Sequence, residues 1–488
     1  MKKKLMGLDK RWLALFVLCG GSLMIVLDST IVNVALPSIR TSLGFSQSSL
    51  AWVVNAYLLT FGGFLLLGGR LGDLFGHRRL FLLGITLFTL ASVLCGLSTA
   101  QAPLIIARGI QGLGGAVASA VGLSLMMDLF KTDSDRAKAM GVFGFVTAGG
   151  GSLGVLLGGV LTDLLNWHWI FLVNLPVGAL VYFLSVKLLP KAHTRDHKVK
   201  LDVAGAVTVT LSQLLAVYAV VNGNQAGWLS VQTLGLLAGA AALMATFLTI
   251  EHRAKSPLVP LRFFRLRNLR TANAIGVLWA AAMFAWFFLS ALYLQLVLQY
   301  TPLNVGLAFL PANVIMAIFS VGLSAKLVMR YGIKTPLSVG LTLAALGLLL
   351  LARAPVDGHF LTDVLPSMLL LGVGAGMAFN PVLLAAMSDV GPQESGLASG
   401  IVNTSFMMGG ALGLAVLASL AASRTNHLVA SGAHELPALT SGYHVAFVVG
   451  AAFALLAAGI GALVLKTKAP APQGHAETPT AKPIAEAI

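Results

Sequence analysis

Charged residues are scarce in this chain. Asp, Glu, Lys and Arg make up 10% of its 488 residues and hydrophobic residues make up 57%. A soluble globular chain carries roughly 25% charged residues, so we expect most of this chain to lie in lipid. The sequence has no Gly-x-x-x-x-Gly-Lys-Ser/Thr loop, which excludes ATP hydrolysis of the P-loop kind. Its ten His residues fall outside or at the edges of the apolar stretches, so none of them pair to hold a haem inside the membrane.

Long apolar stretches are what the chain has instead. About 20 mostly apolar residues cross a bilayer as a helix, and continuous runs of this length exclude a barrel of short alternating strands. Cys19 and Cys95 fall in different stretches near opposite faces, so we expect no disulfide between them. We predict an all-α polytopic membrane protein with fourteen spans, at approximately 12–36, 49–69, 80–98, 103–125, 139–160, 168–189, 202–221, 230–250, 271–299, 303–325, 336–353, 362–386, 397–422 and 443–465.

The formal net charge of +15 indicates orientation in a membrane rather than nucleic-acid binding. With both termini in the cytoplasm, nearly all of the 32 Lys and Arg residues fall in cytoplasmic loops and tails. The exceptions are Arg40, Arg353 and Arg424 outside and Arg108 within a span. This asymmetry is the positive-inside signature and predicts cytoplasmic termini. One cytoplasmic loop, around Asp389 and Glu394, has no Lys or Arg of its own.

Asp28 is the most informative residue because it lies well inside the first apolar stretch. No other acidic residue does so, since Asp202 and Asp363 fall at the ends of their spans. An ionised carboxylate in hydrocarbon is costly, so it must be paired, hydrated by a cavity or protonated. Such a residue marks a substrate, ion or proton pathway by default. A permanently protonated acid that only packs helices is the alternative interpretation.

Arg108 is the expected partner of Asp28. At 1.5 Å per residue, Asp28 lies roughly 24 Å from the inner face and Arg108 roughly 8 Å from the outer face. In a hydrocarbon core of about 30 Å the two charges reach similar depths, and Gln111 shares the helical face of Arg108. A carboxylate holds its proton more tightly in apolar surroundings and releases it more readily beside a guanidinium. Alternating access to Asp28 would therefore couple protons to transport. A purely structural pair, or an Arg108 that reaches the outer interface, is the alternative.

An internal repeat divides the chain. The segment 69–79 after the second span is echoed by 325–335, with basic, Leu, aromatic, Gly and basic positions in the same order. Two related bundles with a site between them are typical of a rocking transporter. Residues 251–270 predict either an amphipathic segment on the inner leaflet or a topology-setting basic loop. We predict an N-terminal six-helix bundle at 1–190, inserted helices 7 and 8 with basic cytoplasmic loops at 191–270, a C-terminal six-helix bundle at 271–466 and a disordered cytoplasmic tail at 467–488.

Four motifs stand out along the chain. They are LDSTIVNVALP at 27–37, GRLGDLFGHRR at 69–79, LIIARGIQGLGGA at 104–116 and WHWIFLVNLPVG at 167–178. Together they resemble the span-1 signature, the loop between spans 2 and 3, the span-4 motif and the span-6 entry of the major facilitator superfamily, specifically its fourteen-span drug:proton antiporters. The resemblance covers nearly the whole chain apart from the tail. It implies the major facilitator fold, with two six-helix bundles plus two inserted helices, and a transporter rather than an enzyme.

The resemblance also implies roles for two groups of residues. A charge latch that steadies the outward-open state would include Gly69, Asp73, Gly76, Arg78 and Arg79, and an ordinary positive-inside loop is the alternative. Span 5 resembles the antiporter helix of the family through Gly141, Gly150, Gly154, Gly158 and Gly159. The 150/154/158 spacing is also a small-residue ridge that lets helices approach closely. Val155 stands where the family usually has Pro, which removes a kink and weakens antiport against uniport or symport.

Polar side chains inside the spans are candidates for a substrate cavity. We predict that the cavity is lined by Asn33, Asn55, Tyr57, Gln295, Gln299 and Asn380. Gln295 and Gln299 would share a helical face at i, i+4. Aromatic residues surround span 9, so we expect some of them to face lipid. Others would form a wall for a planar lipophilic guest, with cation–π contacts of about 0.5–2 kcal/mol; core packing or interface anchoring is the alternative.

The leading hypothesis is a proton-coupled antiporter of the bacterial inner membrane that exports lipophilic drugs or toxic compounds. A dedicated exporter of an endogenous metabolite is the second hypothesis, and a polytopic membrane enzyme is a remote third. With Asp28 as the only acid well inside a span, we expect one proton per substrate. A dication would then move net charge against about 2.3 kcal/mol per 100 mV, which favours monovalent or neutral compounds. The expected partners are the small-molecule substrate, protons and the bilayer, without nucleic acid, cofactor or metal, and we expect a monomer.

Overall fold

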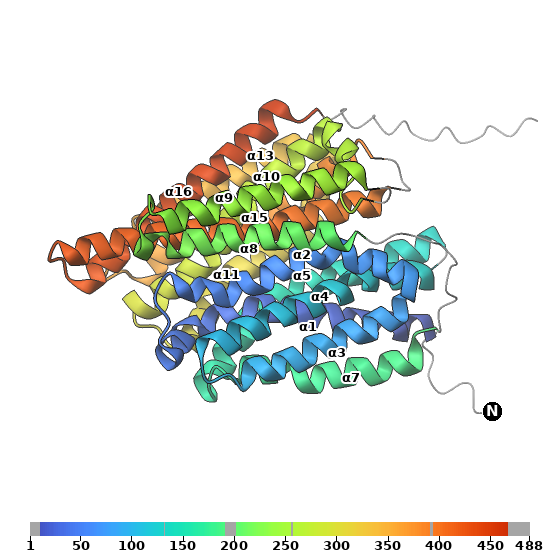
Figure 1. The fold of residues 1–488 in the computed structure, drawn as a ribbon, viewed down its shortest axis with the longest axis horizontal. Helices are drawn as coiled ribbons and strands as arrows, with labels where there is room; N and C mark the ends of the chain where they lie inside the picture. The colour runs from blue at the N-terminus through green and yellow to red at the C-terminus, as the bar shows by residue number, and fades with distance from the viewer. Residues whose placement is uncertain (1–9, 131, 191–201, 255–256, 391–393, 467–488) are drawn as a thin grey trace, which may run out of the picture.

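All regular structure in the described part of the chain is helical (Figure 1). The computed structural model describes residues 10–130, 132–190, 202–254, 257–390 and 394–466, so the predicted tail at 467–488 lies outside the described residues. Among these residues, twelve helices are long and apolar enough to cross a membrane. Two further apolar segments, Leu153–Leu164 and Pro302–Ile318, are shorter. The helical membrane fold is confirmed, whereas the exact count of fourteen spans stays a prediction.

Residues 10–188 form one helical bundle. Its helices do not pack in sequence order, because α4 packs against α2 as well as α3, and α1 packs against α5 and α7. They are α1 (Lys10–Leu43), α2 (Trp52–Phe75), α3 (His77–Gly96), α4 (Gln101–Leu129), α5 (Asp133–Leu164), the short α6 (Trp169–Leu172) and α7 (Asn174–Leu188). Cys19 and Cys95 are both free, as expected from their separate spans.

The last third of the chain forms a second bundle. Three five-residue π-helical segments interrupt it, at Tyr293–Val297, Phe319–Leu323 and Phe360–Val364. Its helices are α10 (Arg267–Leu292), α11 (Pro302–Ile318), α12 (Ser324–Tyr331), α13 (Lys334–Leu351), α14 (Leu365–Met387), α15 (Ser395–Ala430) and α16 (Glu435–Val464). The predicted repeat has a geometric counterpart, because Gly76 ends α2 with φ +92° and Gly332 ends α12 with φ +73°. Positive φ of this kind favours glycine.

Helix α10 lies at the centre of the second bundle, in contact with α14, α15 and α16. Its aromatic side chains Trp279, Trp286, Phe287 and Phe288 are buried and Phe284 is half-buried. The expectation that some of them face lipid is therefore wrong. A helix that is apolar on every side is surrounded by neighbouring helices rather than placed at the rim of a bundle.

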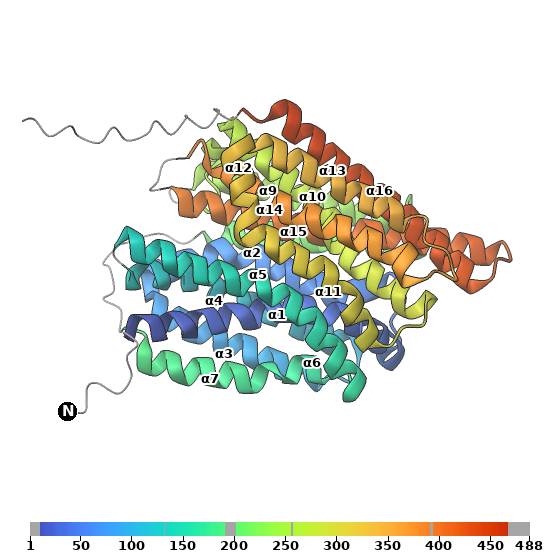
Figure 2. The same ribbon diagram turned by 180° about the vertical axis from the view of Figure 1, so that it is seen from behind.

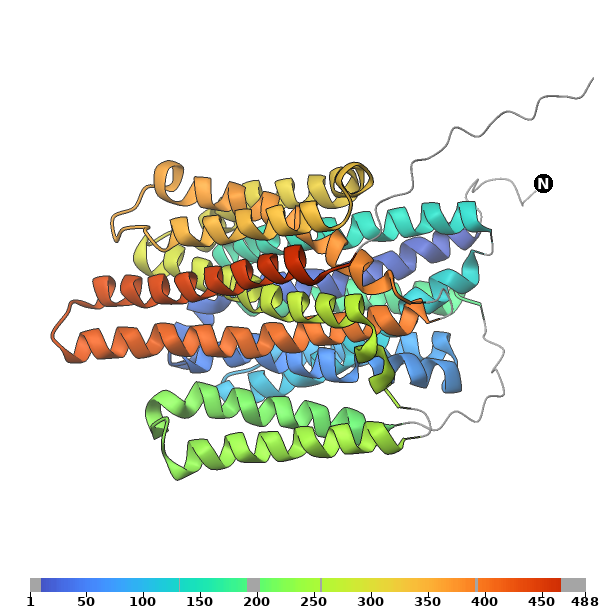
Figure 3. The ribbon, with the colours of Figure 1, turned by 90° about the horizontal axis from the view of Figure 1, so that it is seen from above.

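The two bundles meet along two helix pairs. Helix α5 packs against α11, and α2 packs against α15; Figure 2 shows α5 beside α11 between the blue half and the yellow-to-red half. Between the bundles in sequence, α8 (Val203–Ala226) and α9 (Val231–Arg253) form a hairpin. The hairpin stands at one edge of the molecule, where α8 contacts both α2 and α15 (Figure 3).

The acidic loop that lacks Lys and Arg is matched by partners from elsewhere in the chain. Asp389 accepts hydrogen bonds from the backbone N–H (2.8 Å) and the Nδ2 (2.9 Å) of Asn268. The guanidinium of Arg262 donates to Glu394 at 2.5 Å. Arg262 comes from the segment that joins α9 to α10, and Asn268 lies in the first turn of α10. Within the joining segment, only Leu261–Arg265 is helical, as a short 3-10 turn. The described part of this segment therefore anchors the acidic loop and contains no long amphipathic helix.

Candidate functional site

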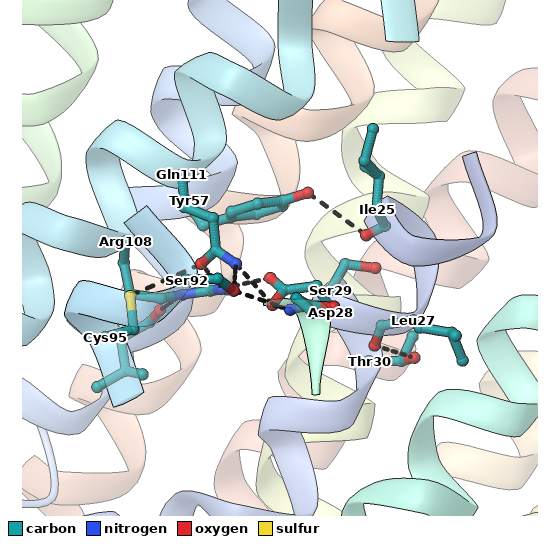
Figure 4. A network of polar contacts seen from close by, with 12 residues as sticks. Ile25, Leu27, Asp28, Ser29, Thr30, Tyr57, Ser92, Cys95, Arg108 and Gln111 are labelled. Atoms are coloured by element: carbon teal, nitrogen blue, oxygen red, sulfur yellow. Dashed lines mark hydrogen bonds and ion pairs between the residues drawn. The ribbon is translucent and has the colours of Figure 1, made fainter. Parts of the chain in front are cut away.

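Asp28 lies in the middle of α1 with none of its surface exposed. Its Oδ2 accepts a hydrogen bond from Nη1 of Arg108 at 2.5 Å, and this contact is an ion pair. Its Oδ1 accepts from Nε2 of Gln111 at 2.7 Å and from Nδ2 of Asn174 at 2.9 Å. Side chains from α1, α4 and α7 thus meet at one carboxylate, and Ser92 of α3 extends the network. Four helices of the first bundle therefore contribute to it (Figure 4).

Arg108 is held on three sides as well as by Asp28. Its Nη1 also donates to Oε1 of Gln111 at 2.7 Å, and its Nε donates to the backbone carbonyl of Val53 on α2 at 2.9 Å. Its guanidinium carbon lies 4.4 Å from the centre of the Tyr57 ring. A buried ion pair is tolerated only when its remaining donors and acceptors are also paired. This site meets that condition, and removal of either charge would leave the other uncompensated.

The polar network contains residues that sequence reasoning did not assign to the site. Ser92 accepts from Gln111 Nε2 at 2.7 Å and from Asn174 Nδ2 at 2.8 Å. The thiol of Cys95 lies 3.7 Å from Oε1 of Gln111. Asn174 sits inside the motif at 167–178, where a lone amide in an apolar run was the available signal. Nothing in the sequence around Ser92 distinguishes it from a serine that bonds its own helix.

Glycines on α5 bring that helix against α1 on both sides of Asp28. A Cβ at Gly154 would lie 2.8 Å from the carbonyl oxygen of Leu27, and one at Gly158 would lie 2.5 Å from that of Ile31. A Cβ at Gly150 would contact Leu23 and Val26. These three positions therefore form the predicted ridge. Gly159 points elsewhere, to the carbonyl of Pro302 on α11, and the surroundings of Gly141 lie outside the described side chains.

The sequence model of the Major Facilitator Superfamily matches residues 18–414. The chain belongs to this superfamily. It is 36% identical over 482 residues to puromycin resistance protein pur8 of Streptomyces alboniger, covering 97% of this chain and 95% of that protein. It is 37% identical to cephamycin export protein CmcT of Amycolatopsis lactamdurans, with 91% and 90% covered. It is 38% identical to multidrug resistance protein Stp of Mycobacterium tuberculosis, with 83% and 74% covered.

Solved structures of other superfamily transporters share the fold at low sequence identity. A bacterial homologue of the human lysosomal transporter Spinster, inward-facing and unoccupied, superposes with a TM-score of 0.66 at 16% identity, covering 94% of this chain and 98% of that one. An auto-inhibited POT-family peptide transporter gives a TM-score of 0.64 at 17% identity, with 92% and 96% covered. This chain is accordingly a multi-pass membrane transporter of the superfamily.

The loop at 69–79, for which a charge latch is predicted, holds its described polar contacts at one end of the first bundle. Asp73 is exposed and contacts Nε2 of His77 at 3.3 Å, and the other ring nitrogen of His77 contacts Asp128 at 3.2 Å. Arg78 donates to the carbonyl of Val186 at 2.6 Å. Among the described residues, the contacts given for these side chains all stay within the first bundle. Gly69, Gly76 and Arg79 complete the loop, with Arg79 exposed.

The predicted cavity residues of this transporter do not form one group. Tyr57 lies against Arg108, and Asn55 is fully buried with neither side-chain polar atom paired among the described residues. Gln295 donates to the carbonyl of Val34 at 2.8 Å, across the two bundles. Gln299 is exposed beyond the end of the helix with φ +56°, so the shared face expected for these two glutamines does not exist. Asn33 bonds its own helix at Thr30, and Asn380 is half-buried on α14.

Within the described residues, no group of three or more His, Cys, Asp or Glu side chains lies close enough together to hold a metal ion. The buried site offers one carboxylate, that of Asp28, held against one guanidinium, that of Arg108.

Proposed function

We propose that this superfamily member is a proton-coupled antiporter that exports lipophilic compounds by alternating access in the bacterial cytoplasmic membrane. The observation that carries the proposal is the enclosed pair of Asp28 and Arg108, joined by Gln111 and Asn174. An intramembrane acid with a named partner is the usual mark of a proton relay. A coupling site needs a group whose charge changes during the cycle, and Asp28 is the residue here that satisfies this need.

Protonation of Asp28 would loosen the first bundle at one point. A neutral carboxyl group loses most of its attraction for the guanidinium of Arg108, while Arg108 keeps its bonds to Gln111 and to the carbonyl of Val53. The attachment of α1 to α4 therefore weakens while α4 and α2 stay joined. A proton or a cationic substrate that competes for the same carboxylate would then exclude the other, which is the condition for antiport.

The contacts between bundles support alternating access. The Gly159 backbone of α5 meets Pro302 of α11, and Gln295 reaches Val34 of α1. All four residues lie toward the end of the molecule where α1 finishes, away from Lys10. The bundles also approach each other toward the opposite end, where a Cβ at Gly400 of α15 would lie 2.5 Å from Leu66 of α2. Rocking of the bundles would open one of these two contacts at a time.

The names of the relatives support lipophilic drugs as the substrate class. They include a puromycin resistance protein and a multidrug resistance protein. The cephamycin export protein and a probable actinorhodin transporter of Streptomyces coelicolor favour a second candidate, a dedicated exporter of a metabolite that the cell itself makes. The same coupling site serves either substrate class.

The charge inventory supports one proton per substrate. Among the described residues, the buried acids are Asp28 in the middle of α1, Asp202 at the start of α8 and Glu251 near the end of α9. Asp28 is the one of these three that lies in the middle of a span, so it is the candidate for the coupling acid. Exchange of one proton for one monovalent cation moves no net charge. Exchange of one proton for a dication moves charge against about 2.3 kcal/mol per 100 mV.

The experiment is dye uptake into everted membrane vesicles with an imposed pH gradient, acid inside. We expect the native chain to accumulate ethidium, a lipophilic monocation, and to lose the uptake when a protonophore is added. The Asp28→Asn variant should show none, while Asp163→Asn, which changes an exposed acid on α5, should match the native chain. An imposed interior-positive potential should slow uptake of the dication propidium and leave ethidium unchanged.

Each alternative has its own result. Ethidium uptake that survives in Asp28→Asn moves coupling away from this carboxylate. Equal sensitivity of ethidium and propidium to the potential contradicts the single-proton exchange. Uptake by neither form, at normal protein levels, contradicts a broad drug exporter and favours the dedicated exporter of a metabolite.

A further inference from the structure

A basic pocket lies where the inserted hairpin meets the two bundles, outside the Asp28 network. It has a volume of about 600 Å³. Arg70 of α2, His252 at the end of α9 and Leu397 near the start of α15 line it. The 3-10 turn between α9 and α10 adds Arg262 and Arg265. The pocket therefore touches both bundles and the hairpin.

Two arginines of this pocket have no protein partner among the described residues. Arg70 and Arg265 form no hydrogen bond or ion pair there, whereas the guanidinium of Arg262 is bonded to Glu394. Arg70 is half-buried and Arg265 is exposed. A guanidinium presents five N–H donors, accepts no hydrogen bond and stays charged. Two of them in one pocket favour an anionic guest.

Glu251, the acidic side chain of the lining, contributes little negative surface. Only 3% of it is exposed, and its Oε2 accepts a hydrogen bond from the backbone N–H of Val259 at 3.1 Å. With Glu394 counted as well, three guanidiniums face two carboxylates, so the pocket keeps a net positive charge even when His252 is neutral. A zwitterionic guest would bring its own cation beside these guanidiniums, which makes an anion the better occupant.

The pocket lies at the depth of the lipid headgroups. Helix α9 is a candidate membrane span that ends at Arg253, and the pocket begins at its last turn. This end of α9 lies on the same side of the molecule as the start of α1 (Figure 3), the side that the positive-inside pattern assigns to the cytoplasm. Basic pockets between spans on that side bind the phosphate groups of lipids. Arginine pairs with phosphate through two parallel hydrogen bonds.

An apolar cavity adjoins the basic pocket. Leu261 lines both, and the apolar cavity has a volume of about 320 Å³. Leu248 of α9 and Phe264 of the 3-10 turn line this cavity with 46% and 36% of their surface exposed, on the part of the protein that meets hydrocarbon. A free phosphate ion matches the basic pocket alone. A phospholipid matches both, with its headgroup in one and an acyl chain in the other.

We propose that the basic pocket binds the phosphate group of an anionic phospholipid from the cytoplasmic leaflet, with Arg70 and Arg265 as its principal ligands. One acyl chain of this lipid lies in the adjoining apolar cavity. The bound lipid joins α2 of the first bundle to α15 of the second, through the segment between α9 and α10. A requirement of transport for anionic lipid rests on the proposed function, whereas the binding itself does not.

The test is lipid binding to the purified full chain in neutral detergent, measured by native mass spectrometry. The probes are dioleoylphosphatidylglycerol, which is anionic, and dioleoylphosphatidylcholine, which has the same chains and no net charge. We expect the native chain to prefer phosphatidylglycerol. Arg70→Gln and Arg265→Gln should each weaken its binding by roughly ten-fold, through the loss of hydrogen bonds to a charged group. Unchanged binding of phosphatidylcholine shows that each variant is folded. Arg330→Gln, at an exposed position of α12 outside the pocket, should change neither lipid.

Two further measurements distinguish a lipid from a free anion. Inorganic phosphate at the same concentration should not displace phosphatidylglycerol. Val209 of α8 lines the apolar cavity, so Val209→Phe should weaken phosphatidylglycerol binding, whereas Val207→Phe at an exposed position of the same helix should not. Displacement by inorganic phosphate overturns the lipid as the occupant. Unchanged binding in Val209→Phe overturns the place assigned to the acyl chain.

Two results overturn the proposal as a whole. Equal binding of the two lipids by the native chain contradicts recognition of negative charge. Unchanged phosphatidylglycerol binding in the double variant Arg70→Gln/Arg265→Gln moves the lipid away from this pocket.

The proposed function and this site fail separately. Asp28→Asn should bind phosphatidylglycerol as the native chain does, because Asp28 does not line the pocket, while its proton-driven ethidium uptake is lost. Preferential binding of phosphatidylglycerol together with absent uptake by the native chain contradicts the exporter and keeps the site. Normal uptake without preferential binding overturns the site and keeps the exporter.

Discussion

The two bundles bury different kinds of side chain. The first encloses Asp28 and Arg108 in a network in which the principal donors and acceptors are paired. In the second, the described residues bury no charged side chain; its core holds Trp279 and Trp286, whose ring N–H groups have no partner among those residues. The core of the first bundle therefore depends on a pair of opposite charges, whereas the core of the second bundle depends on the packing of apolar side chains.

Because their cores differ in this way, the two bundles should differ in their sensitivity to substitution. A charge network is sensitive to the removal of any member, because the remaining charge stays buried. An apolar core with unpaired polar atoms tolerates the loss of those atoms. Substitutions of the same type in the two bundles should therefore have different consequences, and four comparisons follow in order of expected size.

Removal of Arg108 should have the largest effect. Arg108→Gln leaves the Asp28 carboxylate buried without a counter-charge, and breaking a buried pair in this way costs about 3–5 kcal/mol. We expect a matching drop in the thermal unfolding temperature of the purified protein. Arg330→Gln, at an exposed position of the second bundle, is the matched change and should be nearly neutral. Similar unfolding temperatures for both variants would contradict the contrast.

Two buried asparagines, one in each bundle, should respond differently to the same substitution. Asn174→Leu removes a donor to Asp28 and to Ser92, and a hydrogen bond to a charged group contributes about 1.5–3 kcal/mol. Asn313 on α11 is buried with neither polar atom paired among the described residues, so Asn313→Leu should leave stability unchanged or raise it. Thermal unfolding of the two variants measures the difference. A loss of stability in Asn313→Leu would show that its amide has a partner.

Close glycine packing should be a property that the bundles share. A Cβ at Gly154 would lie 2.8 Å from the Leu27 carbonyl, and one at Gly372 would lie 2.5 Å from that of Ala312. We expect Gly154→Ala and Gly372→Ala each to cost about 1–3 kcal/mol through overpacking. Gly151→Ala is the control, because nothing lies within 4 Å of its Cβ. A neutral Gly154→Ala, measured by unfolding and by uptake, would mean that α5 is free to move from α1.

The ion pair of Arg262 and Glu394 should contribute least. Its side chains are 69% and 41% exposed, and an exposed pair contributes about 0–1 kcal/mol. Arg262→Ala should lower the unfolding temperature slightly at low salt and not at all at high salt, because salt screens exposed charges. A large, salt-independent loss would place this contact among the principal links of the second bundle.

The pair of Asp28 and Arg108 could be predicted from the sequence because few charged side chains are tolerated inside a membrane span. Asp28 and Arg108 are both costly in lipid, and their depths along two antiparallel spans agree. Ser92 and Asn174 carry no such signal, since neutral polar side chains in a helix commonly bond their own backbone, as Asn33 does. Their positions depend on how α3 and α7 pack around α1, which is a property of the assembled bundle.

Two predictions are wrong because they depend on geometry that the sequence does not show. Gln295 and Gln299 do not share one face, because the π-helical turn at Tyr293–Val297 ends the regular helical register. The aromatics of α10 were expected to reach lipid in part, and the helix is instead enclosed by its neighbours. The membrane-spanning helices were predictable from the apolar runs, because span length and composition follow directly from the thickness of the bilayer. The arrangement in two bundles was predicted instead from the internal repeat and from the motifs that resemble the superfamily.

The link between Gln295 and Val34 ends on the main chain. A backbone carbonyl is present whatever side chain occupies position 34, so substitutions there leave the acceptor in place. A substitution at position 34 therefore keeps the link as long as α1 keeps its place, whereas loss of the amide at position 295 removes the donor. The contact between the bundles thus depends on the side chain of one partner and on the backbone of the other.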